Sequence, residues 1–146
     1  MAFSAPQLSL KGRALRLLSQ REHSRAELER KLAAHEAEPG SLGRALDELQ
    51  AKGFISEERV VESVIHRRAS KLGTARVQQE LAAKGLSPES MADALEQLRG
   101  TELERARAVW SRKFGESATD PKERAKQMRF LLSRGFVAEV VRKVTG

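Results

Sequence analysis

The chain has 146 residues and a formal net charge of +7, and it contains neither Cys nor Tyr. The lack of Cys excludes disulfides, thiolate catalysis and thiolate metal sites, and it fits a reducing compartment. Only 4% of the residues are aromatic, so a core must come mainly from Leu, Ala and Val, which favours helices over sheets. The composition therefore predicts an all-α protein.

The positive charge is concentrated in the last third of the chain. Residues 1–104 hold 16 Lys and Arg against 16 Asp and Glu, whereas residues 105–146 hold 11 against 4, which is the whole excess of +7. This asymmetry indicates an acidic partner, either nucleic acid or an acidic protein surface, that binds mainly the last third. A solvated helical face that aids solubility explains the same charge equally well.

Glycine and proline mark the ends of the expected helices, because glycine adopts the left-handed C-cap conformation and proline fits a first helical turn. Apolar periodicity between these marks predicts nine helices. Their expected ranges are 9–20, 25–36, 42–52, 57–71, 75–84, 88–99, 102–114, 121–134 and 137–144. Capping boxes are expected at Ser24/Glu27, Thr101/Glu104 and Asp120/Glu123, and simpler side-chain caps at Ser56, Thr74 and Ser87.

The sequence contains an internal repeat. Leu32-Ala33-Ala34 recurs as Leu81-Ala82-Ala83, and the apolar pattern of residues 45–49 recurs at 94–98, both at an offset of 49 residues. A fainter third copy follows at an offset of 50, where Lys84-Gly85-Leu86 matches Arg134-Gly135-Phe136. The repeat predicts three tandem three-helix units, at residues 1–52, 53–100 and 101–146.

Each of these units is too small to bury a core alone. We therefore expect neighbouring units to stack into an elongated, curved rod with one concave face. Such a face suits binding along a groove or filament better than it suits enclosing a small substrate.

No set of residues in the sequence predicts an active site. His23, His35 and His66 lack metal-ligand spacing and are expected to be surface helix residues. Glycine-rich phosphate loops are absent as well, so we expect no catalysis, no cofactor, no metal and no small-molecule substrate. Trp110 shares a helical face with apolar neighbours and is expected to lie in the core rather than to stack on a base.

The sequence also lacks an apolar run of membrane-spanning length and a start that resembles a secretory signal. We therefore expect a cytoplasmic protein without a membrane partner.

The basic residues predict a binding surface. In the expected helix 121–134, Lys122, Lys126 and Arg129 form a row at i, i+4 and i+7, beside an apolar stripe. The stripe is expected to comprise Ala125, Met128, Leu131 and Leu132. Further cations flank the turn at Gly73 or lie in the expected helix 102–114. The candidate partner-binding residues are Arg68, Lys71, Arg76, Lys84, Arg105, Arg112, Lys122, Lys126 and Arg129.

Part of the chain resembles the helical portion of a winged-helix transcription regulator. The resemblance rests on residues 24–28, 45–49 and 52–55. In that fold a β-wing should follow, whereas here Ser56 begins a capped helix with four apolar residues on one side. A transcription regulator or another free-standing nucleic-acid-binding protein is therefore the alternative interpretation.

Over its whole length the sequence resembles the RecX family of bacterial recombinase regulators. The resemblance is most specific in GFISEERVVESVIHRR at 53–68 and GTARVQQELAAKGL at 73–86, and it includes LLSQREHSRAELERKL at 17–32. It implies tandem three-helix repeats and a partner, the RecA recombinase, in whose filament on single-stranded DNA the protein lies along the helical groove. It further implies inhibition of RecA, with effects on recombination, DNA repair and the SOS response, and possible contact with DNA.

The resemblance also implies which residues follow the family pattern: Arg59, Arg68, Gly73, Arg76, Glu80, Leu81, Lys84 and Gly85. Three of them, Gly73, Leu81 and Gly85, are structural by their chemistry. For Arg59 and Glu80, ion pairs within the chain and contacts with a partner are equally expected. The sequence departs from the pattern at Val60, where the family has an aromatic residue, and at Thr74, where proline is common.

Overall fold

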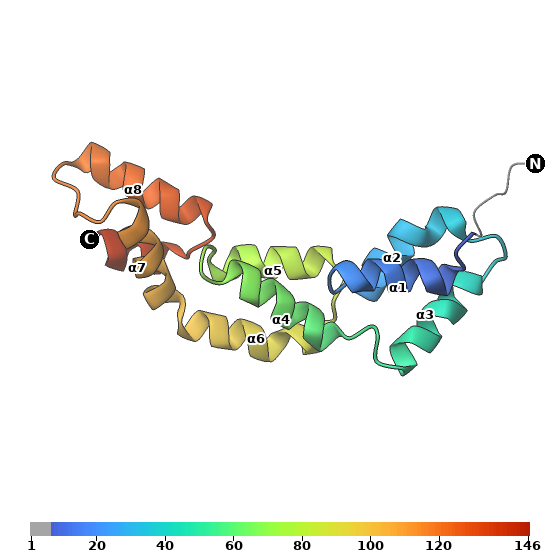
Figure 1. The fold of residues 1–146 in the computed structure, drawn as a ribbon. Coiled ribbons are helices and arrows are strands. Elements are labelled where there is room, and N and C mark those ends of the chain that lie inside the picture. Colours follow the sequence, from blue (N-terminus) through green and yellow to red (C-terminus); the bar gives the residue numbers. More distant parts are fainter. Residues whose placement is uncertain (1–6) are drawn as a thin grey trace, which may run out of the picture. The chain divides into compact units, whose positions relative to one another are not determined.

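The computed structural model describes residues 7–146, which contain nine α-helices, one 3₁₀ helix and no strand (Figure 1). The α-helices are α1 (Leu10–Gln20), α2 (Arg25–Leu32), α3 (Ser41–Ala51), α4 (Glu57–Arg68), α5 (Thr74–Ala83), α6 (Pro88–Gly100), α7 (Glu102–Lys113), α8 (Pro121–Ser133) and α9 (Ala138–Thr145), and the 3₁₀ helix is η1 (Ala33–His35). The prediction of an all-α fold is confirmed. The largest differences lie at the ends of α2 and α4, which were expected at residues 36 and 71.

The chain divides into two compact units, the first ending at Val60 and the second spanning Val61–Gly146, so that α4 crosses the boundary. In the first unit, α1, α2 and α3 pack against one another. Their shared core is aliphatic and consists of Ala14, Leu28, Leu32, Leu42, Leu46, Leu49 and Ile55. Leucine dominates this core because straight-chain apolar residues fit helical interfaces at little entropic cost.

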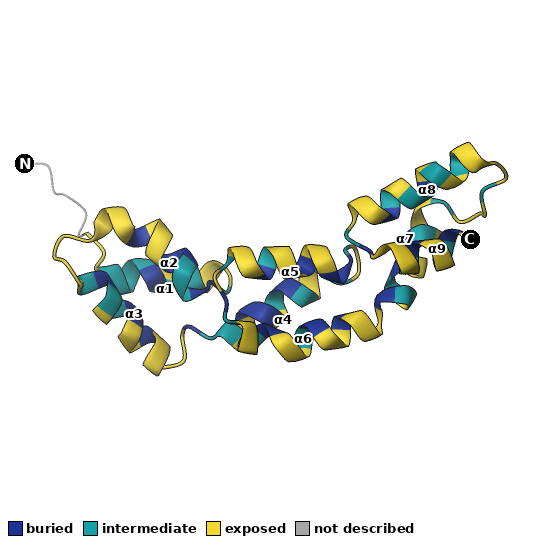
Figure 2. Ribbon diagram, turned by 180° about the vertical axis from the view of Figure 1, so that it is seen from behind, coloured by how far each residue is buried: buried dark blue, intermediate teal, exposed yellow. Residues whose placement is uncertain are grey.

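The second unit contains two helix groups. Figures 1 and 2 show the end of α4 beside α5 and α6, and Val61, Val64, Val77 and Leu81 of this group are buried. The helices α7, α8 and α9 pack together around Ala106, Val109, Leu131, Phe136 and Val141, with Trp110 packed against them. The expectation that Trp110 belongs to a core is confirmed.

Glycines permit a close contact between the two helix groups of the second unit. The Gly73 N–H donates to the Arg134 carbonyl oxygen at 2.7 Å. A Cβ added to Gly73 would lie 2.2 Å from the Gly135 carbonyl oxygen, and one added to Gly135, whose φ is +91°, would lie 2.2 Å from Arg76 Cγ. Both positions therefore require glycine. Arg76 extends the contact by donating from Nη1 to the Ser133 carbonyl oxygen at 2.8 Å.

Two expected helix caps are wrong. Thr101 ends α6 and precedes α7 with φ −109° and ψ 5°, and its side chain makes no cap hydrogen bond, so the Thr101/Glu104 box does not form. Thr74 lies inside α5 rather than before it, and its N–H donates to Glu102 Oε1 at 2.8 Å. The reciprocal box at Ser24 and Glu27 is confirmed. Side-chain caps are also confirmed at Ser56 and Ser87. At Asp120 only half of the expected box forms: its side chain accepts the Glu123 N–H, but Glu123 does not return a bond.

None of the helices in the described part of the chain is long and apolar enough to cross a membrane.

Candidate partner-binding surface

Arg105 has an intramolecular role. Its Nη1 donates to the carbonyl oxygens of Ala69 at 3.0 Å and Leu72 at 2.6 Å. Its Nη2 donates to the Leu98 carbonyl oxygen at 2.8 Å and to Thr74 Oγ1 at 3.1 Å. Burial lowers the pKa of Arg105, which nevertheless stays charged at neutral pH. The sequence placed Arg105 on the partner surface; its donors instead connect α7 to the segments around it.

Three further basic residues of the family pattern also have partners within the chain. Arg68 Nε lies 3.3 Å from Glu80 Oε1, and Arg59 Nε lies 3.0 Å from Glu22 Oε1. Arg76 is exposed, but its guanidinium is held by the bond to Ser133. For Arg59 and Glu80, the interpretation as intramolecular pairs is confirmed. Such partly exposed pairs contribute roughly 0–1 kcal/mol to stability, so they orient side chains more than they stabilise the fold.

The other candidate cations of the second unit differ in exposure. Lys84 is half-buried at the C-cap of α5. Lys71, between α4 and α5, is exposed. Arg112 on α7 is exposed and donates from Nη2 to the Ser70 carbonyl oxygen at 2.6 Å, which holds its guanidinium beside the α4–α5 connection.

The three cations of the α8 row are exposed as expected. Lys122, Lys126 and Arg129 form no ion pair or side-chain hydrogen bond with any residue of the described range 7–146. Along the helix axis, Lys122 and Lys126 are about 6 Å apart and Lys126 and Arg129 about 4.5 Å apart, since each residue rises 1.5 Å. The row is therefore a line of unneutralised charge that a partner can reach.

The expected apolar stripe beside this row is partly wrong. Leu132 is 45% exposed, whereas Gln127, which was not expected inside, is 3% exposed. The Trp110 Nε1–H donates to Gln127 Oε1 at 2.9 Å, and Gln127 Nε2 donates to the Glu116 carbonyl oxygen at 3.1 Å. A buried polar side chain is stable here because its hydrogen-bonding groups are satisfied.

A shallow pocket of about 270 Å³ opens beside the row, and we call it the Phe130 pocket. It is lined by Lys71, Val109, Arg112, Lys113, Phe130 and Arg134. Lys113 Nζ lies 5.4 Å and Arg134 Cζ 4.9 Å from the centre of the Phe130 ring, and the Phe114 ring meets Phe130 edge-on at 5.5 Å. These cations are attracted to the negative ring face.

The sequence interpretation missed Lys113, Phe130 and Arg134. A signal was present, because Lys122, Lys126, Phe130 and Arg134 follow one another at intervals of four residues and so share a stripe of α8 and its C-cap. Reading Phe130 as a member of the basic row, rather than leaving it unassigned beside the core, would have extended the row to the pocket.

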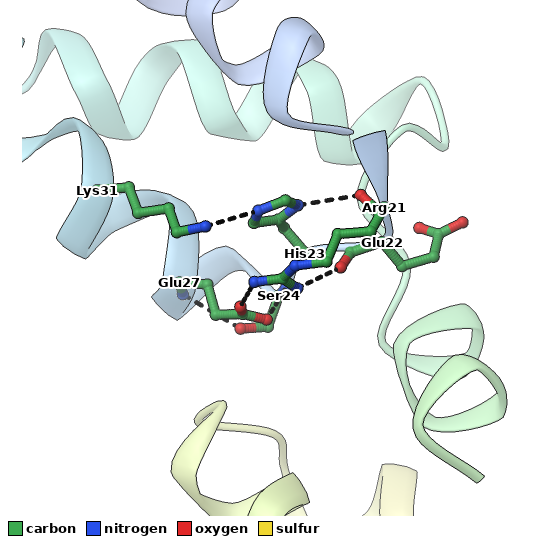
Figure 3. A network of polar contacts seen from close by, with 6 residues as sticks. All are labelled: Arg21, Glu22, His23, Ser24, Glu27 and Lys31. Atoms are coloured by element: carbon green, nitrogen blue, oxygen red, sulfur yellow. Dashed lines mark hydrogen bonds and ion pairs between the residues drawn. The ribbon is translucent and has the colours of Figure 1, made fainter. Parts of the chain in front are cut away.

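His23 contradicts the expectation of a surface helix residue. It lies before α2 and is 1% exposed, whereas His35 and His66 are exposed as expected. Figure 3 shows its ring between Lys31, whose Nζ is 3.0 Å from Nε2, and the Arg21 carbonyl oxygen, 3.0 Å from Nδ1. Because the ammonium can only donate, Nε2 accepts and Nδ1 carries the proton. Burial lowers the pKa of His23 from 6.5.

The buried ring thus has a structural role. Among residues 7–146, no group of three or more His, Asp or Glu side chains is arranged to hold a metal ion.

Comparison with known proteins identifies the family. The models described as the first, second and third three-helix domains of RecX match residues 11–49, 56–95 and 101–145. The chain belongs to the RecX family. RecX relatives named regulatory protein RecX include one from Leptothrix cholodnii, 58% identical over 99% of this chain and 92% of its own length. Another, from Ralstonia nicotianae, is 48% identical over 99% of this chain and 91% of its own.

Solved RecX structures share the fold. A crystal structure of regulatory protein RecX superposes with a TM-score of 0.75 at 21% identity, over 92% of this chain and 70% of that chain. The structure of RecX from Lactobacillus salivarius gives a TM-score of 0.76 at 18% identity, over 92% of this chain and 91% of that one. The tandem three-helix organisation is thus that of the RecX fold.

Proposed function

We propose that this protein is a cytoplasmic, non-enzymatic regulator that binds the RecA recombinase filament on single-stranded DNA and mainly inhibits it. The observation that carries the proposal is the match of all three RecX domains along one chain, to relatives that are named regulatory proteins. The RecX resemblance supplies RecA as the partner. The consequences of this inhibition would extend to recombination, DNA repair and the SOS response.

Binding alone is a sufficient mechanism for such a regulator. A protein that binds one state of a filament more tightly than another shifts the population toward the favoured state, without any chemical step. The exposed cations of α8 supply long-range attraction to acidic side chains or to phosphates, which accelerates encounter. The small open pocket beside them is below the roughly 300–1,000 Å³ of pockets that enclose small ligands, so it favours binding of a partner's surface group.

The test is RecA ATP hydrolysis on single-stranded DNA, with this protein titrated to amounts well below those of RecA and of DNA. We expect the rate to fall while free DNA is still in excess, since a RecA-directed regulator acts through the filament. If the rate falls only when the protein saturates the DNA, competition for phosphates explains the effect and a free-standing nucleic-acid-binding protein replaces our proposal.

The placement of the interface has its own test. A variant with Lys122→Glu, Lys126→Glu and Arg129→Glu reverses the charge of the row. We expect it to need at least about tenfold more protein for half-inhibition, as expected when several exposed charge contacts change sign.

The matched control reverses three other exposed cations of the second unit, by Arg99→Glu, Arg107→Glu and Arg142→Glu, and so has the same net charge. Equal inhibition by the two folded variants would show that net charge rather than the row matters. Full inhibition by the row variant would place the interface elsewhere.

A further inference from the structure

The Phe130 pocket contains more positive charge than its surroundings neutralise. Its four cations are Lys71, Arg112, Lys113 and Arg134. None of them forms an ion pair with a carboxylate in residues 7–146, and Arg112 alone has a side-chain hydrogen bond, to a backbone carbonyl. Cations gathered around one opening repel one another, so the site is most stable when an anion occupies it.

The Phe130 ring does not offer a free face for base stacking. Lys113 and Arg134 both lie over it within the distance of cation–π contact, and Phe114 meets it edge-on. A base would have to displace at least one of these cations from the ring. The ring instead holds the two cations in position for an anionic group, which makes charge rather than stacking the source of affinity.

The pocket is continuous with a line of positive charge. Lys122 and Lys126 precede Phe130 and Arg134 at intervals of four residues, on a ridge that winds slowly around α8 and rises about 6 Å at each interval. A single small anion would use only one end of this arrangement. A polymer that carries a charge on every unit matches both the pocket and the stripe, which favours a phosphate backbone over an isolated phosphate ion or a lone carboxylate.

We propose that the Phe130 pocket binds a backbone phosphate of single-stranded nucleic acid through charge alone, without reading the bases. The site therefore tolerates any sequence. The assignment concerns direct contact with nucleic acid, so it is independent of the proposed action on RecA and is tested without RecA.

The first experiment measures binding of a fluorescein-labelled oligothymidylate by fluorescence anisotropy over a range of salt concentrations. The variant is Lys71→Gln with Lys113→Gln, both exposed, and its control is Arg99→Gln with Arg107→Gln, which removes two exposed cations elsewhere in the same unit. Loss of the one phosphate that the pocket neutralises should lower the slope of log affinity against log salt by about 0.7 and weaken binding roughly tenfold at low salt. The control should change the slope by less than half as much.

The second experiment uses two altered oligonucleotides with the unaltered protein. An oligomer of abasic deoxyribose phosphates should bind within about twofold of oligothymidylate, whereas neutral methylphosphonate linkages should weaken binding at least about tenfold. Tenfold weaker binding of the abasic oligomer would overturn the proposal in favour of base stacking. Inorganic phosphate that displaces the oligomer better than chloride at equal ionic strength would reduce the site to a free-phosphate site.

Binding of a carboxylate from a partner protein, instead of a nucleic-acid phosphate, predicts a different result. If the Lys71→Gln/Lys113→Gln variant binds oligothymidylate with the affinity and salt slope of the unaltered protein, the pocket does not hold a phosphate and the proposal fails. Loss of RecA inhibition in that same variant would then assign the pocket to a carboxylate of the protein partner. Trp110 fluorescence and circular dichroism of both variants show whether each is folded.

Discussion

Replacing Arg105 by Met should destabilise the second unit substantially. Met retains the apolar stem that packs between α7 and its neighbours but removes the guanidinium. The two shortest of its bonds are to the carbonyl oxygens of Leu72 at 2.6 Å and Leu98 at 2.8 Å. At about 1.5 kcal/mol for each bond from a charged group, the expected loss in the free energy of unfolding is about 3 kcal/mol. The bonds to Ala69 and Thr74, at 3.0 and 3.1 Å, are left out, so this figure is a lower limit.

Urea unfolding followed by the fluorescence of Trp110 measures this loss, since Trp110 is the single Trp of the chain and lies in the same unit. Arg107→Met is the matched control, because Arg107 is exposed on the same helix. We expect the control to stay within about 0.5 kcal/mol of the unaltered protein. If Arg105→Met also stays within that limit, the guanidinium does not stabilise the contact between the helix groups, and Arg105 is again a candidate partner-binding residue.

Three other changes test particular features. Burial keeps the pKa of His23 in the folded protein below 6.5, so the unfolded chain binds a proton on this ring more readily. Stability is therefore retained above pH 6.5 and falls as the pH drops through the lower pKa of the folded protein. His23→Gln should flatten that fall in thermal unfolding followed by circular dichroism, and an unchanged pH dependence would show that Lys31 and the ring do not control it. Gly73→Ala should lower the free energy of unfolding by about 3 kcal/mol or more in the Trp110 assay, because its Cβ would lie 2.2 Å from a backbone oxygen. A smaller loss would mean that the backbone at Gly73 and Gly135 can move apart to make room. Gly43→Ala, inside α3 with nothing within 4 Å of the added Cβ, should stabilise by about 1 kcal/mol, and a lower melting temperature would contradict the packing described for α3.

The helices were predictable from the sequence because their signals are local. Gly53 and Gly85 have positive φ at the helix ends that they were expected to mark, and Ser24 caps α2 as its spacing with Glu27 predicts. The Thr101 cap failed because its hydroxyl donates to carbonyl oxygens at the end of α6 instead of capping α7. The Thr74 cap failed because a distant residue takes part. Thr74 cannot be recognised as an interior helical residue without Glu102, which accepts its N–H from another helix.

The candidate site was predictable only in part, for the same reason. Exposure of Lys122, Lys126 and Arg129 follows from helical periodicity, which the sequence contains. The role of Arg105 depends on where the carbonyl groups of two other segments lie, and no spacing rule encodes that position. The prediction that His23 lies on the surface was wrong for the same reason, because its burial results from packing of a connection that the sequence marks as polar.

The contacts of the cations help to decide whether the positive charge serves solubility or the binding of a partner. A net charge of +7 fits a solvated surface as well as it fits a binding surface. In the structure, Arg68, Arg76 and Arg105 direct their donors to groups within the chain. A surface that serves solubility alone does not require some cations to be bound internally and others to be left exposed. Of the exposed cations without an ion pair in residues 7–146, the three of the row lie on α8 and four line the Phe130 pocket, while others, such as Arg99, Arg107 and Arg142, lie elsewhere in the second unit. Solubility alone does not require four cations to line one pocket, because placing them together raises their mutual repulsion. Their clustering therefore favours an anionic partner, and the matched charge-reversal variants separate the two explanations.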